Sequence, residues 1–345
     1  MTYSPIANQR FLTALFGGEF PGHALIMAMP GASPIPGDFT VNDEPIGCRV
    51  NLIEREYERE CRFHEAVGDD SVPFANLHTG TGIFAAAFGC PIVEFEGSNP
   101  ASQPIVHTAA EADALSEPDP WSSPLGRHLE LVAAVRDRLG ADIPVSGPDM
   151  QSPLGLAAQI WEKAEFMSAL IEEPEIAREI IRKCHNLVKN YLIELRKIAP
   201  NMNAIHCPRI WGPAELGASV SEDEVGAISR AMYEEFGLRC LIDLSETFGG
   251  LYMHCCASAD HQYPAFQKIP NLRGLNRVYQ SPGAKPALDA FGGRTVHMEW
   301  GTLETFRSLL DFDAPGVRFA FCYSPTSIDD AKRTLEVLRK WCPRT

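Results

Sequence analysis

Hydrophobic residues fall into short runs that end in glycine, proline or polar side chains, and longer amphipathic stretches lie between most of these runs. A strand that is buried on both faces reads as a nearly continuous apolar run, so each run predicts one strand. Eight runs fit this description: residues 24–31, 92–98, 143–150, 203–213, 250–258, 272–280, 294–301 and 317–325.

The amphipathic stretches predict helices. In residues 165–200 apolar side chains recur at roughly helical spacing among charged ones, and Pro174 opens the second of two helices. A further helix is predicted from Ser221, as its N-cap, to just before Gly237, and another over residues 327–341.

Alternating strands and helices favour a parallel sheet, and eight strands in 345 residues predict an α/β fold of the closed (β/α)8 TIM-barrel type. We expect one domain over residues 1–345, with an N-terminal helical extension. An open nucleotide-binding sheet is disfavoured because neither GxGxxG nor GxxxxGK[ST] occurs.

The formal charge of -15, from 45 acidic and 30 basic side chains, argues against nucleic acid and anionic membranes as partners. The apolar segments are too short or too interrupted to span a bilayer, and the first residues do not resemble a secretion signal. We therefore expect a cytoplasmic protein, in which the ten cysteines are reduced and act as core residues or metal ligands.

The strand predicted at residues 250–258 carries the most specific chemistry. His254 and Cys256 are two positions apart, so they project to one face while Cys255 projects to the other. Cys322 ends the last predicted strand and could reach across the barrel mouth. One imidazole and two thiolates with an open fourth position form the ligand pattern of a catalytic zinc site. Spacing alone leaves open a packed histidine with two core thiols.

Polar residues at other strand ends complete the predicted site. We expect catalytic roles for Glu299 and Asp149, and substrate contacts from Gln151, Asn276 and His297. His297 and Glu299 could instead be salt-bridge partners, and Asp149 and Gln151 could instead cap the following helix.

The order of these motifs resembles the uroporphyrinogen decarboxylase superfamily, and specifically its zinc-dependent, corrinoid-linked methyltransferase branch. The resemblance covers nearly the whole chain and implies that zinc binds His254, Cys256 and Cys322. The family's usual glycine after His-x-Cys is replaced by Ala257, and the flanks of Cys322 also differ from the family pattern. The similar segments are residues 8–21, 143–161, 166–191, 216–225, 249–258 and 319–338.

The resemblance implies transfer of a methyl group between a corrinoid (cobalamin) carrier and a thiol or similar small-molecule acceptor. No D-x-H-x-x-G motif occurs, so we expect the corrinoid on a partner protein or as free methylcobalamin. The sequence leaves the oligomeric state open, with a homodimer as one option. Two alternatives remain: a decarboxylase for a different substrate, and a non-catalytic barrel that binds a small ligand. Porphyrinogen decarboxylation itself is disfavoured because residues 27–37 lack the arginines that would bind its carboxylates.

Overall fold

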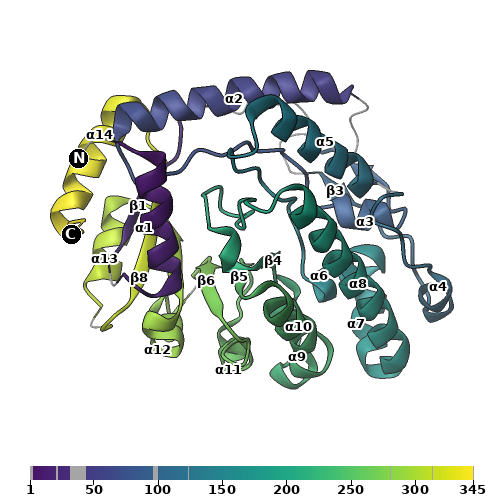
Figure 1. Cartoon of the computed structure of the whole chain (residues 1–345). Helices are drawn as coiled ribbons and strands as arrows, with labels where there is room; N and C mark the ends of the chain where they lie inside the picture. The colour runs from purple at the N-terminus through teal and green to yellow at the C-terminus, as the bar shows by residue number, and fades with distance from the viewer. Residues whose placement is uncertain are drawn as a thin grey trace.

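The computed structural model describes residues 3–20, 22–31, 44–95, 100–122, 124–279, 281–312 and 314–344. Its main feature is a six-stranded parallel sheet in the order β1-β8-β7-β6-β5-β4 (Figure 1). These strands are β1 (Ala24–Met27), β4 (Ala218–Ser221), β5 (Leu251–Cys255), β6 (Leu272–Arg277), β7 (Val296–Trp300) and β8 (Arg318–Tyr323).

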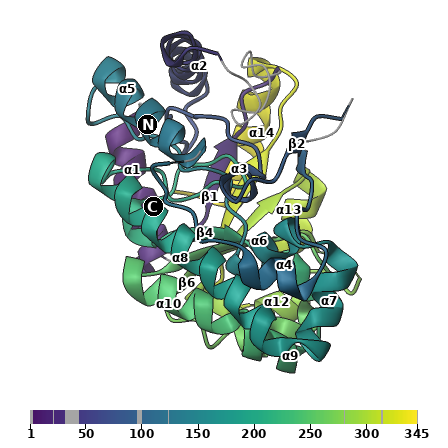
Figure 2. The same cartoon turned by 90° about the vertical axis from the view of Figure 1, so that its right-hand side faces the viewer.

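Helices surround the sheet on its outer face and cover one end of it. Helix α2 runs along the top of Figure 1 and is seen nearly end-on in Figure 2. None of the described helices is long and apolar enough to cross a membrane. The helices are α1 (Pro5–Gly17), α2 (Ile46–Val67), α3 (Ile83–Ala87), α4 (Ala109–Ala114), α5 (Pro124–Leu139), α6 (Pro153–Ile160), α7 (Lys163–Glu172), α8 (Pro174–Ile198), α9 (Arg230–Phe236), α10 (Leu238–Phe248), α11 (Tyr263–Phe266), α12 (Lys285–Phe291), α13 (Leu303–Leu310) and α14 (Ile328–Trp341).

The remaining wall of the barrel consists of extended segments joined by single parallel bridges. Residues 143–152 lie at its centre, because this segment is bridged to each of three other parts of the wall. The bridges are Ala75 with Val145, Ser146 with Asn203, and Gln151 with Ser221. The predicted α/β barrel is therefore confirmed, with a wall that is regular on one side and irregular on the other.

Two of the predicted strands take a different form. Residues 92–98 contribute β2 (Ile92–Val93), which pairs antiparallel with β3 (Ala101–Ser102) in a separate two-stranded sheet. Residues 203–213 contain one bridge in place of a regular strand, because the Asn203 side chain accepts hydrogen bonds from the backbone N–H groups of Ile205 and Gly212. A short-range side-chain partner can replace strand pairing in this way.

The last residue of β4, Ser221, was predicted to be the N-cap of a helix. Ser221 is not an N-cap: its N–H donates to the Met150 carbonyl, and its own carbonyl accepts from Ser152. The helix begins eight residues later in the chain, where Ser229 caps α9. The helices predicted at Pro174 and over residues 327–341 are confirmed as α8 and α14.

Alternation along β5 defines the two faces of the sheet. Tyr252 lies in the barrel interior, packed in one cluster with Ile26, Met298 and Cys322. Cys255 points the other way and is fully buried in the layer between sheet and helices. This confirms the prediction that Cys255 faces away from His254.

Two buried carboxylates hydrogen-bond to backbone N–H groups of β1, the strand at one end of the sheet. The Leu25 N–H donates to Asp70 Oδ2 at 2.8 Å, and the Met27 N–H donates to Asp69 Oδ2 at 2.7 Å. The backbone N–H of Asp70 in turn donates to the Leu25 carbonyl. These side chains thus provide hydrogen bonds that a neighbouring strand would otherwise provide.

Asp70 is also the anchor for the C-terminal end of the chain, and we expect its neutralisation to destabilise the fold. Its Oδ1 lies 2.6 Å from Arg339 Nη2 and 3.0 Å from Arg344 Nη1. Asp70→Asn keeps the shape but leaves both guanidinium groups without their counter-charge, so the free energy of unfolding should fall by about 3 kcal/mol. Urea denaturation measures this change.

The matched control is Asp289→Asn, which removes an exposed carboxylate paired with Lys285 one helical turn away. Its effect should stay within about 0.5 kcal/mol. Equal effects of the two substitutions would contradict the anchoring role of Asp70.

Candidate functional site

The C-terminal end of β5 meets the end of its neighbour β4, and this meeting places three metal-binding side chains together. Ser221 is in register with His254, and two residues further along each segment Asp223 comes to lie beside Cys256. One ligand atom from each of Asp223, His254 and Cys256 lies within 4.8 Å of the other two. Among the described residues, this is the one group of three histidine, cysteine or acidic side chains that meets this distance.

The imidazole of His254 is held in one orientation. Its Nδ1–H donates to Asn276 Oδ1 at 2.7 Å, and the Asn276 amide donates to the Met298 carbonyl at 2.9 Å. A histidine fixed through one nitrogen presents the lone pair of the other, which is how metal-binding histidines are usually oriented. Asn276 was predicted to contact substrate; the structure places it as the partner that positions His254.

Asp223 and Cys256 form a pair of groups that favour a cation between them. The Cys256 backbone N–H donates to Asp223 Oδ1 at 2.7 Å. Burial, and then the nearby Asp223 carboxylate, raise the pKa of the Cys256 thiol to about 11. A bound divalent metal reverses this effect, because it stabilises a thiolate directly.

Cys322 lies apart from this group, in contrast to its predicted position. It is on β8, which two strands separate from β5, and its side chain is packed in the barrel interior with only 1% exposed. Burial raises the pKa of its thiol. The structure therefore brings together two of the three predicted metal ligands, and adds Asp223 to them.

His297 and Glu299 do not face the barrel mouth. Alternation along β7 directs Met298 inward, and His297 packs in the outer layer against Phe319 at a ring distance of 6.0 Å. Burial lowers the pKa of His297 to about 4 and raises that of Glu299 to about 8. The prediction that both point into the mouth is wrong, because the last residue of β7 that faces inward is Trp300.

Asp149 and Gln151 lie on the irregular side of the wall. Asp149 Oδ1 is 3.5 Å from His206 Nε2, next to the Asp223 group, whereas Gln151 is bridged to β4. The cap of α6 is Ser152, whose hydroxyl accepts from the Gly155 N–H. Neither Asp149 nor Gln151 is thus the helix cap that was left open as an alternative.

Asp223 was not among the predicted ligands, because the segment that follows Ser221 was predicted to be a helix. The parallel register of β4 with β5, which only the folded structure supplies, sets Asp223 beside Cys256. His206 is held against β4 by hydrogen bonds between its ring and the hydroxyls of Ser219 and Ser221. Burial, followed by the charge of His254, lowers the pKa of His206 to about 3.

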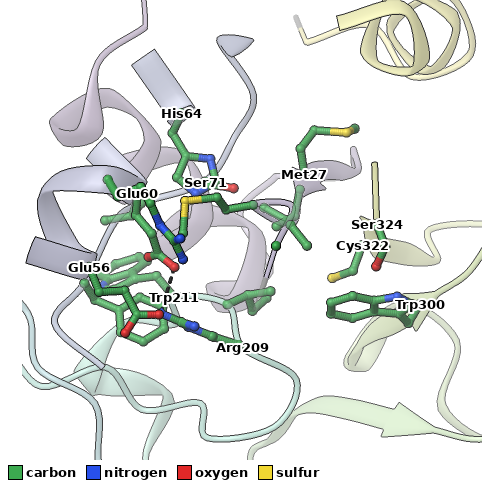
Figure 3. Close-up of a pocket in the computed structure, with 18 residues that line it drawn as sticks. Met27, Glu56, Glu60, His64, Ser71, Arg209, Trp211, Trp300, Cys322 and Ser324 are labelled. Atoms are coloured by element: carbon green, nitrogen blue, oxygen red, sulfur yellow. Dashed lines mark hydrogen bonds and ion pairs between the residues drawn. The ribbon is translucent and has the colours of Figure 1, made fainter. Parts of the chain in front are cut away.

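A cavity of about 290 Å³ lies at the same end of the barrel, between the strand ends and α2. In Figure 3, acidic and basic side chains occupy one side of this cavity and smaller polar and aromatic side chains occupy the other. The first side includes Glu56, Glu60, His64 and Arg209, and the second includes Trp300, Cys322 and Ser324.

The charges on the first side are largely balanced. Arg209 Nη2 lies 3.0 Å from Glu56 Oε1 and 2.8 Å from Glu60 Oε1. Burial alone would raise the pKa of Glu56, but the hydrogen bond from His78 and the charge of Arg209 together lower it to about 2. Glu56 is therefore ionised, and Arg209 is engaged by two carboxylates.

The sequence of this barrel matches a known protein family. The family Uroporphyrinogen decarboxylase (URO-D) matches residues 72–276, which is well over half of the chain. The chain is therefore a member of the uroporphyrinogen decarboxylase family.

A solved structure shares the fold across nearly the whole length. It is a methyltransferase from Methanosarcina mazei, which is 13% identical in sequence and superimposes with a TM-score of 0.67. The alignment covers 98% of this chain and 99% of that one. No curated protein matches the chain.

The raised pKa of Glu299 predicts a pH dependence of stability. Between the ordinary value of 4.5 and about 8, the folded chain keeps a proton at Glu299 that the unfolded chain releases. The free energy of unfolding should therefore fall as pH rises through this range. Glu299→Gln removes this contribution, so the variant should lose less stability than the wild type between pH 5 and pH 8 in urea titrations.

The exposed Glu304 supplies the control. Glu304→Gln should leave the wild-type slope of stability against pH unchanged, because this side chain is in water in both states. A Glu299→Gln slope equal to that of the wild type would show that Glu299 is ionised in the folded protein.

Proposed function

We propose that this protein is a zinc-dependent methyltransferase that moves a methyl group between a corrinoid carrier and a thiol or similar small acceptor. The observation that carries the proposal is the group formed by Asp223, His254 and Cys256 at the barrel mouth. Membership of the family and the shared fold of a methyltransferase support an enzyme of this general kind.

The residues of this group fit zinc. Imidazole nitrogen, thiolate sulfur and carboxylate oxygen are the ligand types that Zn²⁺ binds, and three protein ligands with an open position are typical of catalytic sites. His254 is already oriented by Asn276, and the negative charges of Asp223 and of a Cys256 thiolate would offset the charge of the ion.

For the third ligand we propose Asp223 in place of Cys322. A carboxylate oxygen of Asp223 already lies within 4.8 Å of a ligand atom of His254 and of Cys256, whereas Cys322 is on a strand that is not adjacent to β5. Recruiting Cys322 would require the thiol to leave a packed position in the barrel interior.

Zinc would supply a thiolate at neutral pH, since a metal-bound thiol loses its proton and remains nucleophilic. Asp149 and His206, which border the group, would orient the acceptor. The corrinoid would come from a partner protein or as free methylcobalamin, because the chain has no D-x-H-x-x-G motif.

Decarboxylation of a polycarboxylate is the weaker proposal. Two arginines, Arg59 and Arg209, line the cavity. Arg209 already forms ion pairs with two glutamates. An unengaged arginine cluster, which several substrate carboxylates would require, is not found among the described cavity residues.

Metal binding tests the ligand set. We expect about one zinc per chain, lost in Cys256→Ser and retained in Cys322→Ser. Asp223→Asn should weaken the affinity, and Asn276→Ala should weaken it by about 10- to 100-fold because His254 loses its orienting partner. Metal content of the purified protein and competition with a chromophoric chelator measure these changes.

Cobalt(II) substitution supplies a second measurement, since the sulfur-to-cobalt charge-transfer band reports bound thiolates. This band should be unchanged in Cys322→Ser, and also in Cys48→Ser, which replaces an exposed thiol as the control. A band that halves in Cys322→Ser would show that Cys322 and not Asp223 is the third ligand. Metal-free protein in every preparation would contradict the zinc site altogether.

Methyl transfer is tested with methylcobalamin and a set of small thiols, by following the corrinoid absorbance. The wild-type rate should fall by about two orders of magnitude or more in Cys256→Ser, because metal assistance contributes several kcal/mol to such a reaction. Cys48→Ser should keep the wild-type rate. If the zinc-loaded protein leaves the corrinoid absorbance unchanged with every thiol tested, methyl transfer to a thiol is contradicted.

A further inference from the structure

A buried histidine–carboxylate pair faces the cavity at the barrel mouth. His64 lies in the last turn of α2, and its Nδ1 is 3.0 Å from Oδ1 of Asp69, which follows the helix. His64 is 6% exposed and Asp69 is 1% exposed. Neither residue belongs to the group of Asp223, His254 and Cys256 at the ends of β4 and β5, and the mechanism proposed above does not use the pair.

The carboxylate of this pair is fixed in place. Asp69 Oδ2 accepts from the Met27 N–H at 2.7 Å and from the Ser71 hydroxyl at 2.6 Å. The carboxylate cannot rotate without losing these two donors. Oδ1 therefore accepts from His64 Nδ1–H, and this fixes the tautomer in which Nε2 carries the lone pair.

The other ring nitrogen faces open space. His64 lines the cavity, and none of the described residues makes a hydrogen bond to its Nε2. Much of the surrounding wall is apolar: Ile26, Met27, Val72, Phe74, Ile210 and Trp211. The Nε2 atom thus offers a hydrogen-bond acceptor in a cavity whose wall is partly apolar and partly charged, and polar groups of this kind fix the orientation of a small ligand.

We propose that this cavity binds a small weak acid, a molecule with one hydroxyl or thiol group on an apolar body, and that His64 Nε2 accepts its proton. The volume of about 290 Å³ lies at the lower end of the range for small-molecule sites. An imidazole that is held by a buried carboxylate on one side and open to the ligand on the other has the geometry of a general base.

The proton transfer balances without any further reactant. The O–H or S–H bond of the ligand breaks, its electron pair stays on the ligand, and the proton forms a new N–H bond at His64 Nε2. The imidazolium that results faces the Asp69 carboxylate, and the ligand anion lies in the cavity that Arg209 also lines.

The charged groups around His64 favour this role. Burial lowers the pKa of its imidazole, as does the charge of Arg209, but Asp69 and Glu60 act in the opposite direction and the pKa is raised overall. Glu56 and Arg59 of α2 and the thiol of Cys322 also line the cavity.

The inference goes beyond the proposed function, because it requires neither zinc nor a corrinoid. The cavity lining does not include Asp223, His254 or Cys256. Loss of metal binding and loss of ligand binding in the cavity can therefore be measured separately on the same protein.

The experiment uses 4-nitrophenol, a weak acid whose ionised form is coloured, with the full-length protein. The wild type should bind it and lower the apparent pKa of the bound phenol by about one unit or more. His64→Gln should still bind the neutral phenol but lose this shift, and His64→Ala should recover it when imidazole is added. Ser324→Phe, which fills the cavity from an exposed strand end, should abolish binding.

His185→Gln is the matched control, because this histidine also pairs with an aspartate but does not line the cavity. It should behave as the wild type, and urea denaturation confirms that each variant is folded. Absence of binding to the wild type, or binding unaffected by Ser324→Phe, would overturn the ligand site. A pKa shift retained in His64→Gln would overturn the role of His64.

Discussion

The parallel pairing of β4 with β5 is the constraint on which the rest of the barrel mouth depends. It sets Ser221 against His254, and the same register carries Asp223 to Cys256. On the other side of β5, the pairing with β6 sets His254 against Asn276, which orients the imidazole. A strand in a parallel sheet cannot slip by one residue without turning every side chain to the opposite face. The geometry of the group formed by Asp223, His254 and Cys256 is thus set by the backbone hydrogen bonds of the strands that carry it.

The mouth of the barrel has two separate polar regions. The group of Asp223, His254 and Cys256 lies at the ends of β4 and β5, and the cavity lies under α2 at the ends of β1, β7 and β8. Residues 206–211 join them, because His206 bonds β4 while Arg209 and Trp211 line the cavity. The cavity region depends on the buried carboxylate of Asp69, which accepts hydrogen bonds from the Met27 N–H, the Ser71 hydroxyl and His64. This is the condition under which a buried charge is tolerated.

Much of the fold and part of the site could be predicted from local patterns. The apolar runs at β1 and β5 to β8 and the helical periodicity of α8 and α14 reflect burial, which acts on each segment separately. The alternation of His254, Cys255 and Cys256 was equally local. The side of the sheet on which His297 and Glu299 lie could not be predicted in this way. Alternation shows which residues share one face of a strand, but it does not show which face points into the barrel.

The sequence by itself determined the alternation of strands and helices, the H-x-C pair on one face of a strand, and an acidic chain without nucleotide-binding loops. The tertiary structure alone decided that Asp223 and not Cys322 stands beside that pair, and that the ring of His64 opens onto a cavity formed by segments far apart in the chain. The reason is physical: periodicity reports which side of an element is buried, whereas the identity of a neighbour depends on strand order and register. Those are properties of the closed barrel and not of any one segment.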